Sequence, residues 1–436
     1  MNQTSTYKSS ITTIITFIGV SVGLGNVWRF PYMMGSYGGS AFLFVYLMFT
    51  LLFAIPALMA EIALGRTTGG GIISAFVKSA GQPLGRVIGY ILLITITISG
   101  SYYLVVVSNV IFTTGYFLLH GFSGQQITQY SSYLSNGWLQ YLVTLLTLFL
   151  SLVVIHRGMR RGIEMVSNII VPMFVLSVLY LIGFTVTIPG ALEELHKFLQ
   201  PNWSALHSKE IFAALGQAFY SVGLGGTFMV AYGRFVKPGS SIPKLALFTS
   251  LGDMGASLMV SFFLVPVILI SGLDMATGPR LIFNTLPRLF SLIPAGWFTG
   301  AIFLLALSLI AFLSLVAAYQ VAVSSFDRDV NDSHTTLKVV ILIGVVQALL
   351  SLPSNLYPSL IGTLDLWFGS GMQILGSILA ILALSWGMGK QKLMFELFNS
   401  RTLGIRRELA AWWIRYAVPL TLIAVLAGYI YESLAG

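Results

Sequence analysis

The five residues Ser21-Val22-Gly23-Leu24-Gly25 recur letter for letter as Ser221-Val222-Gly223-Leu224-Gly225, each time in the middle of a long apolar segment. Glycine costs a helix about 1 kcal/mol per residue, so two glycines around one leucine favour a break in the helix. Unwound backbone is tolerated in a membrane only where it is buried in protein or lines a cavity. Close helix packing is the alternative interpretation, but Gly23 and Gly25 fall on different helix faces. Matching interruptions in two halves of the chain therefore predict the binding site of a helical transporter.

The composition is that of a membrane protein. Apolar residues make up 56% of the 436 residues and charged residues only 8%, whereas a water-soluble domain carries about a quarter charged residues. We expect no cleavable signal peptide, because no small-residue cleavage site follows the apolar stretch after Lys8. Cysteine is absent, which excludes disulfides, thiol catalysis and cysteine zinc sites.

Eleven segments have about the 20 apolar residues that a spanning helix needs. They lie at residues 11–36, 41–64, 87–119, 138–155, 166–188, 211–233, 243–271, 294–325, 337–352, 359–386 and 411–432. Five spans in each repeat, an odd number, would place the second repeat upside-down relative to the first. We therefore expect one all-α transmembrane domain over residues 1–436, built as a 5+5 inverted repeat with broken helices 1 and 6. Repeat one covers about 11–188, repeat two about 211–386, and an extra helix about 411–432.

The basic residues predict the orientation of the chain. With the N-terminus inside, most of the 23 basic residues fall in cytoplasmic segments, and outside loops hold only Lys197, Lys209, Arg280 and Arg288. This asymmetry follows the positive-inside rule and places the N-terminus in the cytoplasm and the C-terminus outside. The net charge of +9 therefore reflects membrane topology rather than nucleic-acid binding.

The residues around the first interruption resemble a known family. Gly19-Val20-Ser21-Val22-Gly23-Leu24-Gly25-Asn26-Val27-Trp28-Arg29-Phe30-Pro31-Tyr32, followed by Glu61-Ile62-Ala63-Leu64-Gly65-Arg66, is similar to the first two helices of the neurotransmitter:sodium symporters. The likeness continues in Ser101-Tyr102-Tyr103, Gly216-Gln217-Ala218-Phe219-Tyr220-Ser221 and Thr249-Ser250-Leu251-Gly252-Asp253, and covers essentially the whole chain. It implies sodium-coupled symport of an amino acid into the cell by alternating access, in the inner membrane of a bacterium.

The resemblance also implies how a zwitterion binds. Backbone amides freed near Leu24 and Gly25 suit a carboxylate, and freed carbonyls of the two breaks suit an ammonium group. Relatives that carry amines without a carboxylate have an aspartate where this chain has Gly23, so an amino acid is expected. Small residues at Ser99, Gly226 and Ala318 favour a bulky hydrophobic or aromatic side chain. The substrate-binding residues expected are Ser21, Leu24, Gly25, Ser99, Tyr103, Tyr220, Ser221, Gly223, Gly226, Ser314 and Ala318.

Sodium is the expected inorganic partner, with one or two ions and no organic cofactor. By resemblance, the first site comprises Ser21, Asn26, Ser221 and Asp253, which supply the oxygen ligands that hard cations need. Chloride-dependent relatives have asparagine in place of Asp253 and a serine at the position of Ser257, so chloride independence is expected. The second site would comprise Gly19, Val22, Ile310 and Ser314, but Leu313 stands where a further oxygen ligand is expected.

A transporter that works by alternating access needs an outer and an inner gate. The outer gate is expected to comprise Arg29, Gln217 and Asp365. The inner gate is not assigned, because the family's arginine and tryptophan are represented by Thr4 and Tyr7, and Lys8 could pair with Asp327 or Asp329.

Three alternative functions are a proton-coupled carrier that titrates Asp253 or Glu61, a non-transporting amino-acid sensor and a membrane enzyme. The five histidines show no metal-ligand spacing and no P-loop is present, so an enzyme is not expected; the chain is expected to be a monomer or weak dimer that contacts lipid and no nucleic acid.

Overall fold

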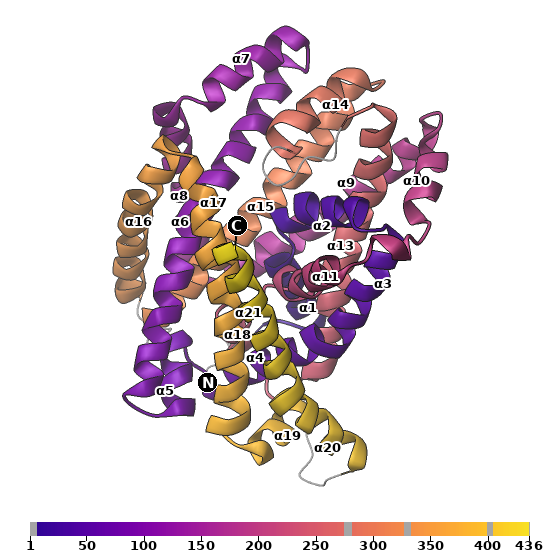
Figure 1. Cartoon of the computed structure of the whole chain (residues 1–436). Coiled ribbons are helices and arrows are strands. Elements are labelled where there is room, and N and C mark those ends of the chain that lie inside the picture. Colours follow the sequence, from indigo (N-terminus) through magenta and orange to yellow (C-terminus); the bar gives the residue numbers. More distant parts are fainter. Residues whose placement is uncertain (1–6, 274–280, 327–332, 399–403, 436) are drawn as a thin grey trace.

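The computed structural model describes residues 7–273, 281–326, 333–398 and 404–435. Over these ranges the chain consists of helices and their connections, with no strand. Figure 1 shows the long helices gathered into one bundle, with short helices at its two ends. The all-α fold expected from the sequence is therefore confirmed.

The helices follow the predicted spans closely. In the described residues, nine helices are long and apolar enough to cross a membrane, or ten if one bent pair counts as a span. The nine are Ser40–Thr68, Leu84–His120, Gly137–His156, Arg161–Thr187, Ile242–Ile270, Gly296–Phe326, Leu337–Leu356, Ser359–Gly387 and Ile405–Gly428. The bent pair is α1 (Ser10–Ser21) with α2 (Leu24–Ser36). The remaining predicted span, 211–233, is divided between α11 (Ser208–Ser221) and α12 (Phe228–Gly233).

Short helices mark the two ends of the bundle. At the top of Figure 1 lie α7 (Gly124–Leu134), α10 (Ala191–Leu199) and α14 (Leu286–Leu292). At the bottom, together with the N-terminus, lie α5 (Ile72–Ala80), α19 (Lys390–Phe398) and α20 (Ile405–Trp412). We call these the upper end and the N-terminal end of the bundle.

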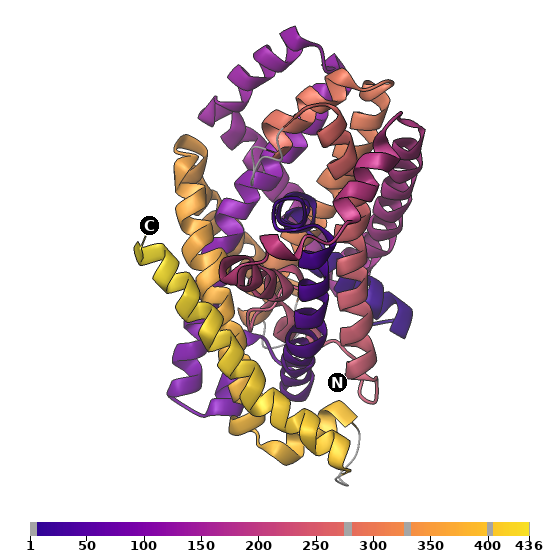
Figure 2. The ribbon, with the colours of Figure 1, turned by 45° about the vertical axis from the view of Figure 1, so that its right-hand side comes forward.

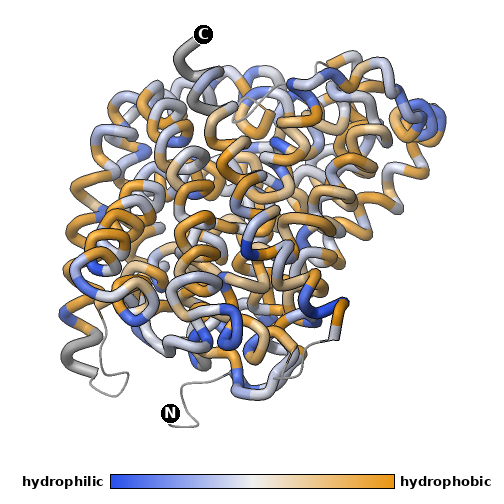
Figure 3. Tube along the Cα trace, turned by 60° about the horizontal axis from the view of Figure 1, so that its bottom comes forward, coloured by the Kyte–Doolittle hydropathy of each residue, from blue (hydrophilic) through white to orange (hydrophobic). Residues whose placement is uncertain are grey.

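The outer faces of the bundle are apolar, as lipid contact requires. Along α8 (Gly137–His156), the side chains of Leu142, Leu146 and Phe149 are all more than half exposed. Figure 3 shows hydrophobic stretches on many helices of the bundle. Figure 2 shows α21 (Val418–Ala435) running along the outside, where it packs against α18 (Met372–Leu382).

The two broken spans lie inside this shell. The helix α1 packs against α9 (Met165–Thr187), α13 (Ile242–Ile270) and α15 (Gly296–Phe326). The helix α11 contacts α2 and α3 (Ser40–Phe49), and α12 packs against α4 (Ile55–Thr68). The long helix α6 (Leu84–His120) packs along α15. Interrupted backbone is therefore surrounded by unbroken helices, which is the arrangement that a bilayer tolerates.

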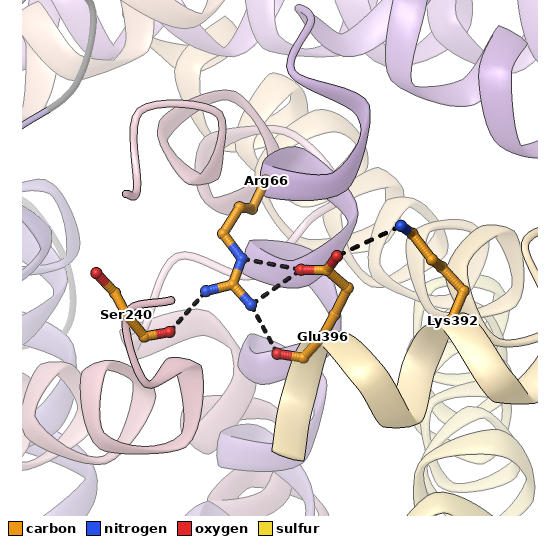
Figure 4. A network of polar contacts seen from close by, with 4 residues as sticks. All are labelled: Arg66, Ser240, Lys392 and Glu396. Carbon is orange, nitrogen blue, oxygen red and sulfur yellow. Dashed lines mark hydrogen bonds and ion pairs between the residues drawn. The ribbon is translucent and has the colours of Figure 1, made fainter. Parts of the chain in front are cut away.

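A charged network joins three segments at the N-terminal end (Figure 4). Arg66, in the last turn of α4, donates from Nε to Glu396 Oε2 at 2.9 Å and from Nη1 to the carbonyl of Ser240 at 2.6 Å. Lys392 lies 3.6 Å from the other carboxylate oxygen of Glu396. Charge-assisted hydrogen bonds of this kind are about twice as strong as neutral ones. The network therefore ties α4 and the segment after α12 to α19.

Candidate functional site

The first chain break separates α1 from α2 by two residues and bends the pair by 64°. Val22 and Gly23 have extended backbone conformations. The N–H of Gly23 donates to Oδ1 of Asn26 at 2.8 Å, so the Asn26 side chain caps the start of α2. The first amides of a helix lack intrahelical partners, and Leu24 and Gly25 both line a cavity at this point.

The second break lies between α11 and α12, where Gly223 and Gly226 have positive φ angles of 67° and 66°. Glu61 of α4 is fully buried, and its Oε1 accepts hydrogen bonds from the N–H groups of Gly225 and Gly226 at 3.0 Å each. The carboxylate therefore takes over two backbone donors that an unbroken helix would satisfy. A Cβ on Gly226 would lie 2.4 Å from the carbonyl oxygen of Gly376, so only glycine fits here.

Both breaks open onto one cavity of about 110 Å³. The rest of the wall comes from α6, α15 and the helices around Asp365 and Gln373. Among the residues expected to bind substrate, those that line it are Ser21, Leu24, Gly25, Ser99, Tyr103, Tyr220, Ser221, Gly223, Ser314 and Ala318. Gly226 is not among the lining residues, since its Cα faces the backbone of Gly376.

One side of the cavity is polar and narrow around Gly23. A Cβ on Gly23 would lie 3.3 Å from the hydroxyl oxygen of Tyr103 and 3.3 Å from that of Ser314. These two hydroxyls come from α6 and α15, and the free amides of α2 begin beside them. Hydroxyl and amide donors that converge on one place can hold an anionic group such as a carboxylate.

Oxygen atoms of three spans meet beneath this cavity. Asp253 is fully buried on α13, and its Oδ1 accepts a hydrogen bond from Asn26 Nδ2 at 2.8 Å. The hydroxyl of Ser221 donates to Oδ2 of the same carboxylate. Asn26 Nδ2 also lies 2.8 Å from the hydroxyl of Ser257, one turn further along α13. Of the four residues expected at the first ion site, Asn26, Ser221 and Asp253 are thus in direct contact, and Ser21 lines the adjoining cavity.

This set of atoms fits a sodium ion chemically. It offers a carboxylate and the hydroxyls of Ser221 and Ser257, which are hard oxygen ligands, whereas Asn26 turns its nitrogen toward them and its amide oxygen toward Gly23. A buried carboxylate without a compensating positive charge is costly in a membrane, at about 2.5–3.5 kcal/mol or more. The described residues hold no group of three or more His, Cys, Asp or Glu side chains that could bind a metal ion.

Of the residues expected in the outer gate, Asp365 lines the cavity, whereas Arg29 and Gln217 do not. The guanidinium of Arg29 lies over the ring of Tyr220, 4.6 Å from its centroid. Asp365 interacts electrostatically with Arg29 and accepts a hydrogen bond from the hydroxyl of Tyr102 at 3.0 Å. Gln217 is fully buried on α11, and neither polar atom of its side chain has a hydrogen-bond partner in the described part of the chain.

The residues expected at the second ion site lie where α1 meets α15. Gly19, Val22 and Ile310 are buried there, and none of them lines the cavity. Ser314 does line it. The side chain of Leu313 is fully buried and contacts Gly19.

Aromatic and charged residues close the N-terminal end below α1. Tyr7 is fully buried, with its ring 6.0 Å from that of Phe17 and 6.2 Å from that of Phe235. Burial raises the pKa of the Tyr7 hydroxyl well above its usual value, so the group stays neutral. Arg234, at the end of α12, is buried and donates to the carbonyl of Ser324 on α15 at 3.2 Å.

Three of the residues considered for the inner gate, Thr4, Asp327 and Asp329, lie outside the described residues. Lys8 uses its backbone N–H to donate to Oε1 of Glu164 at 3.1 Å. Arg234 and Glu164 were both missed by the sequence analysis, although a basic residue at the end of an apolar span is a recognisable signal for an interface position.

Three further cavity residues were also missed. Tyr102, Phe228 and Gln373 line the cavity, although Tyr102 stands beside the expected Tyr103. Phe228 follows the second break directly and places a ring where the small Gly226 suggested open space. The helix around Asp365 is π-helical from Asp365 to Gly371. A π segment shifts the face that later residues present, and no sequence pattern indicates it here.

Comparison with known proteins identifies the family. The profile described as the Sodium:neurotransmitter symporter family matches residues 4–128 and 122–434. The chain belongs to the sodium:neurotransmitter symporter family. Two relatives are an uncharacterized sodium-dependent transporter of Bacillus subtilis, YhdH, with 27% identity over 97% of both chains, and one of Methanocaldococcus jannaschii, with 26% identity over 97% of this chain and 90% of the relative. Sodium:neurotransmitter symporters are transporters and not enzymes.

A solved structure extends the comparison to the fold. The crystal structure of MhsT in complex with L-phenylalanine matches with a TM-score of 0.85 and 27% identity, over 97% of this chain and 99% of that chain. The rabbit sodium- and chloride-dependent creatine transporter is 24% identical over 70% of this chain and 57% of the relative. The broken first and sixth spans of the sodium:neurotransmitter symporter described here thus belong to a fold already seen with a bound amino acid.

Proposed function

We propose that the protein is a sodium-coupled symporter that carries an amino acid into the cell by alternating access. One observation carries the proposal: both chain breaks open onto a single cavity that adjoins the buried contact of Asn26 with Asp253. Free helix amides favour the carboxylate of the substrate. The free carbonyls of the opposite break would accept from its ammonium group.

The ion and the substrate would stabilise each other. A sodium ion beside Asp253 offsets the charge of that carboxylate, and the substrate carboxylate becomes one of its oxygen ligands. Ser21 and Ser221 would serve both, since each lines the cavity and Ser221 also contacts Asp253. Binding of one therefore raises the affinity for the other.

Chloride independence follows from the fixed charge of Asp253. Its carboxylate is fully buried and hydrogen-bonded by Asn26 and Ser221. A chloride ion at the same place would bring a second negative charge against it, and like charges at short range in a poorly solvated site repel strongly. We therefore propose transport without chloride.

We propose a bulky hydrophobic or aromatic amino acid as the substrate. Ser99, Gly100 and Ala318 leave one wall of the cavity free of large side chains. The complex of MhsT with L-phenylalanine shows that a protein of this fold accepts such a molecule. Phe228 would contact the substrate side chain as part of the opposite wall.

The orientation rests on the basic residues. Arg66 and Lys392 lie at the N-terminal end of the bundle (Figure 4). Arg234 lies over the ring of Phe235, which packs against Tyr7 at the same end. The positive-inside rule assigns this end to the cytoplasm. We propose a bacterial inner-membrane protein, monomeric or weakly dimeric, with the N-terminus inside and the C-terminus outside.

Uptake of radiolabelled L-phenylalanine into proteoliposomes tests the proposal. We expect an inward sodium gradient to drive accumulation, with equal rates in chloride and gluconate media. Accumulation driven only by a pH gradient would instead indicate a proton-coupled carrier. Binding of the amino acid without accumulation under any gradient would indicate a sensor. Competition by the other amino acids in the same assay defines the substrate range.

A further inference from the structure

The second sodium set implied by the family resemblance does not fit this chain. Its expected members are backbone carbonyls of Gly19, Val22 and Ile310 with the hydroxyl of Ser314. Sodium binds hard oxygen ligands, several of them at once. The neighbour of Ser314 is Leu313, whose side chain has no oxygen, so α15 can offer one hydroxyl and no carboxylate at this place.

The side chain of Leu313 fills the contact between α1 and α15. It is fully buried. A Cβ placed on Gly19 would lie 2.7 Å from Cδ2 of Leu313 and 3.0 Å from Cγ2 of Val171. Methyl groups of two helices therefore cover the surface of α1 around Gly19. An ion placed among them would lose its hydration and gain only backbone carbonyls as ligands in return.

The remaining hydroxyl of the set belongs to the substrate cavity. Ser314 lines that cavity, and its Oγ would be 3.3 Å from a Cβ on Gly23, as is the hydroxyl of Tyr103. Ser314 is thus placed to bind the amino acid together with Tyr103. The set expected for a second ion is thereby reduced to backbone carbonyls.

We propose that this transporter has lost the second sodium site and moves one sodium ion with each amino acid. The apolar contact of Leu313 with Gly19 takes the place of the ion between α1 and α15. This inference rests on the proposed function and specifies its coupling. Since dispersion and burial of apolar surface need no ligand, this contact holds the two helices together whether or not sodium is present.

One hydroxyl near Gly19 provides an internal check. Ser167 of α9 is fully buried, its Oγ has no hydrogen-bond partner in the described residues, and it would lie 3.6 Å from a Cβ on Gly19. If this hydroxyl replaced the missing ligand of α15, a second ion would still bind. Ser167→Ala distinguishes the two cases, because our proposal predicts that it leaves the ion count unchanged.

The test measures the ratio of radioactive sodium to radiolabelled L-phenylalanine taken up by proteoliposomes, together with the Hill coefficient for sodium. We expect a ratio and a Hill coefficient near one in the wild type and in Ser167→Ala. Leu313→Thr restores an oxygen and should move both values toward two. Leu313→Val is its matched control, since valine has nearly the shape of threonine without the hydroxyl, and should keep both values near one.

A wild-type ratio of two would overturn the inference while leaving sodium-coupled symport intact. Equal ratios in Leu313→Thr and Leu313→Val, with both near two, would overturn it as well. Absence of any sodium-driven uptake would contradict the proposed function itself. If Leu313→Thr does not fold, the ratios of the wild type and Ser167→Ala still decide between one ion and two.

Discussion

Nδ2 of Asn26 lies 2.8 Å from Oδ1 of Asp253, and Oδ1 of the same asparagine accepts the N–H of Gly23 at 2.8 Å. One amide thus connects the first chain break with the buried carboxylate of α13. A change in charge at Asp253 is therefore transmitted directly to the backbone that lines the cavity. We therefore expect substitutions of Asp253 to act on both the ion site and the cavity.

Asp253→Asn should convert the protein into a chloride-dependent transporter. The variant loses the fixed negative charge and keeps the Ser257 hydroxyl, which lies 2.8 Å from Asn26 Nδ2. We expect uptake in gluconate medium to fall at least about tenfold, equivalent to about 1.4 kcal/mol, and to recover when chloride is added. The measurement is initial uptake rate in the two media. The role given to Asp253 would be contradicted if the variant stays inactive when chloride is added. It would also be contradicted if the wild type itself requires chloride.

Gly23→Asp should abolish amino-acid binding. The new carboxylate would stand where the hydroxyls of Tyr103 and Ser314 converge, each about 3.3 Å from its Cβ. It would repel the substrate carboxylate in a poorly solvated place. Equilibrium binding of L-phenylalanine measures the effect. Gly23→Ala is the control for size alone, and the charge argument fails if both variants lose the same affinity.

Glu61→Ala should lower the thermal stability of the protein more than Glu61→Gln. Oε1 of Glu61 is the acceptor for the N–H groups of Gly225 and Gly226, at 3.0 Å each. Leaving a buried donor unsatisfied costs about 1–3 kcal/mol, whereas glutamine retains one carbonyl oxygen. The unfolding temperature in detergent, followed by tryptophan fluorescence, is the readout. Equal unfolding temperatures for the two variants would show that Glu61 does not hold the second break.

Tyr7→Ala should open the path from the N-terminal end to the cavity. The ring of Tyr7 is fully buried between Phe17 and Phe235. The sequence has no cysteine, so Ala318→Cys provides a single thiol in the cavity wall. We expect Tyr7→Ala to raise the rate at which a membrane-impermeant thiol reagent reaches this cysteine from the N-terminal side.

A matched control is available at the opposite end. Tyr130 of α7 is almost fully buried, like Tyr7, but packs against Phe112 and Phe117 near the upper end of the bundle. Tyr130→Ala should leave the labelling rate from the N-terminal side unchanged. If both variants raise the labelling rate equally, the cause is a general loss of packing and not the removal of the Tyr7 ring.

The sequence predicted the spans well because membrane insertion imposes a length and a polarity on each of them. Predicted segments such as 87–119 and 243–271 differ by only a few residues from the helices Leu84–His120 and Ile242–Ile270. The repeated pentapeptide located both breaks for a related reason, since adjacent glycines weaken a helix wherever they occur. These features depend on local sequence and on the bilayer.

Contacts between spans were harder to predict, because they depend on the register of one helix against another. Gly226 suggested free space, yet its Cα faces Gly376 and the ring of Phe228 lines the cavity. Tyr102, and not Arg29 alone, contacts Asp365. Leu313 could be recognised as unusual from its position, but only the structure shows that its methyl group touches Gly19.

We propose that sodium and the amino acid bind together at the two chain breaks. This is tested by the affinity of purified protein for L-phenylalanine in sodium and in choline media, with Asn26→Ala and Asp253→Ala alongside. We expect strong binding by the wild type in sodium, a loss of at least about tenfold in choline, and weak binding by both variants in either medium. Equal affinity of the wild type in sodium and in choline would contradict it.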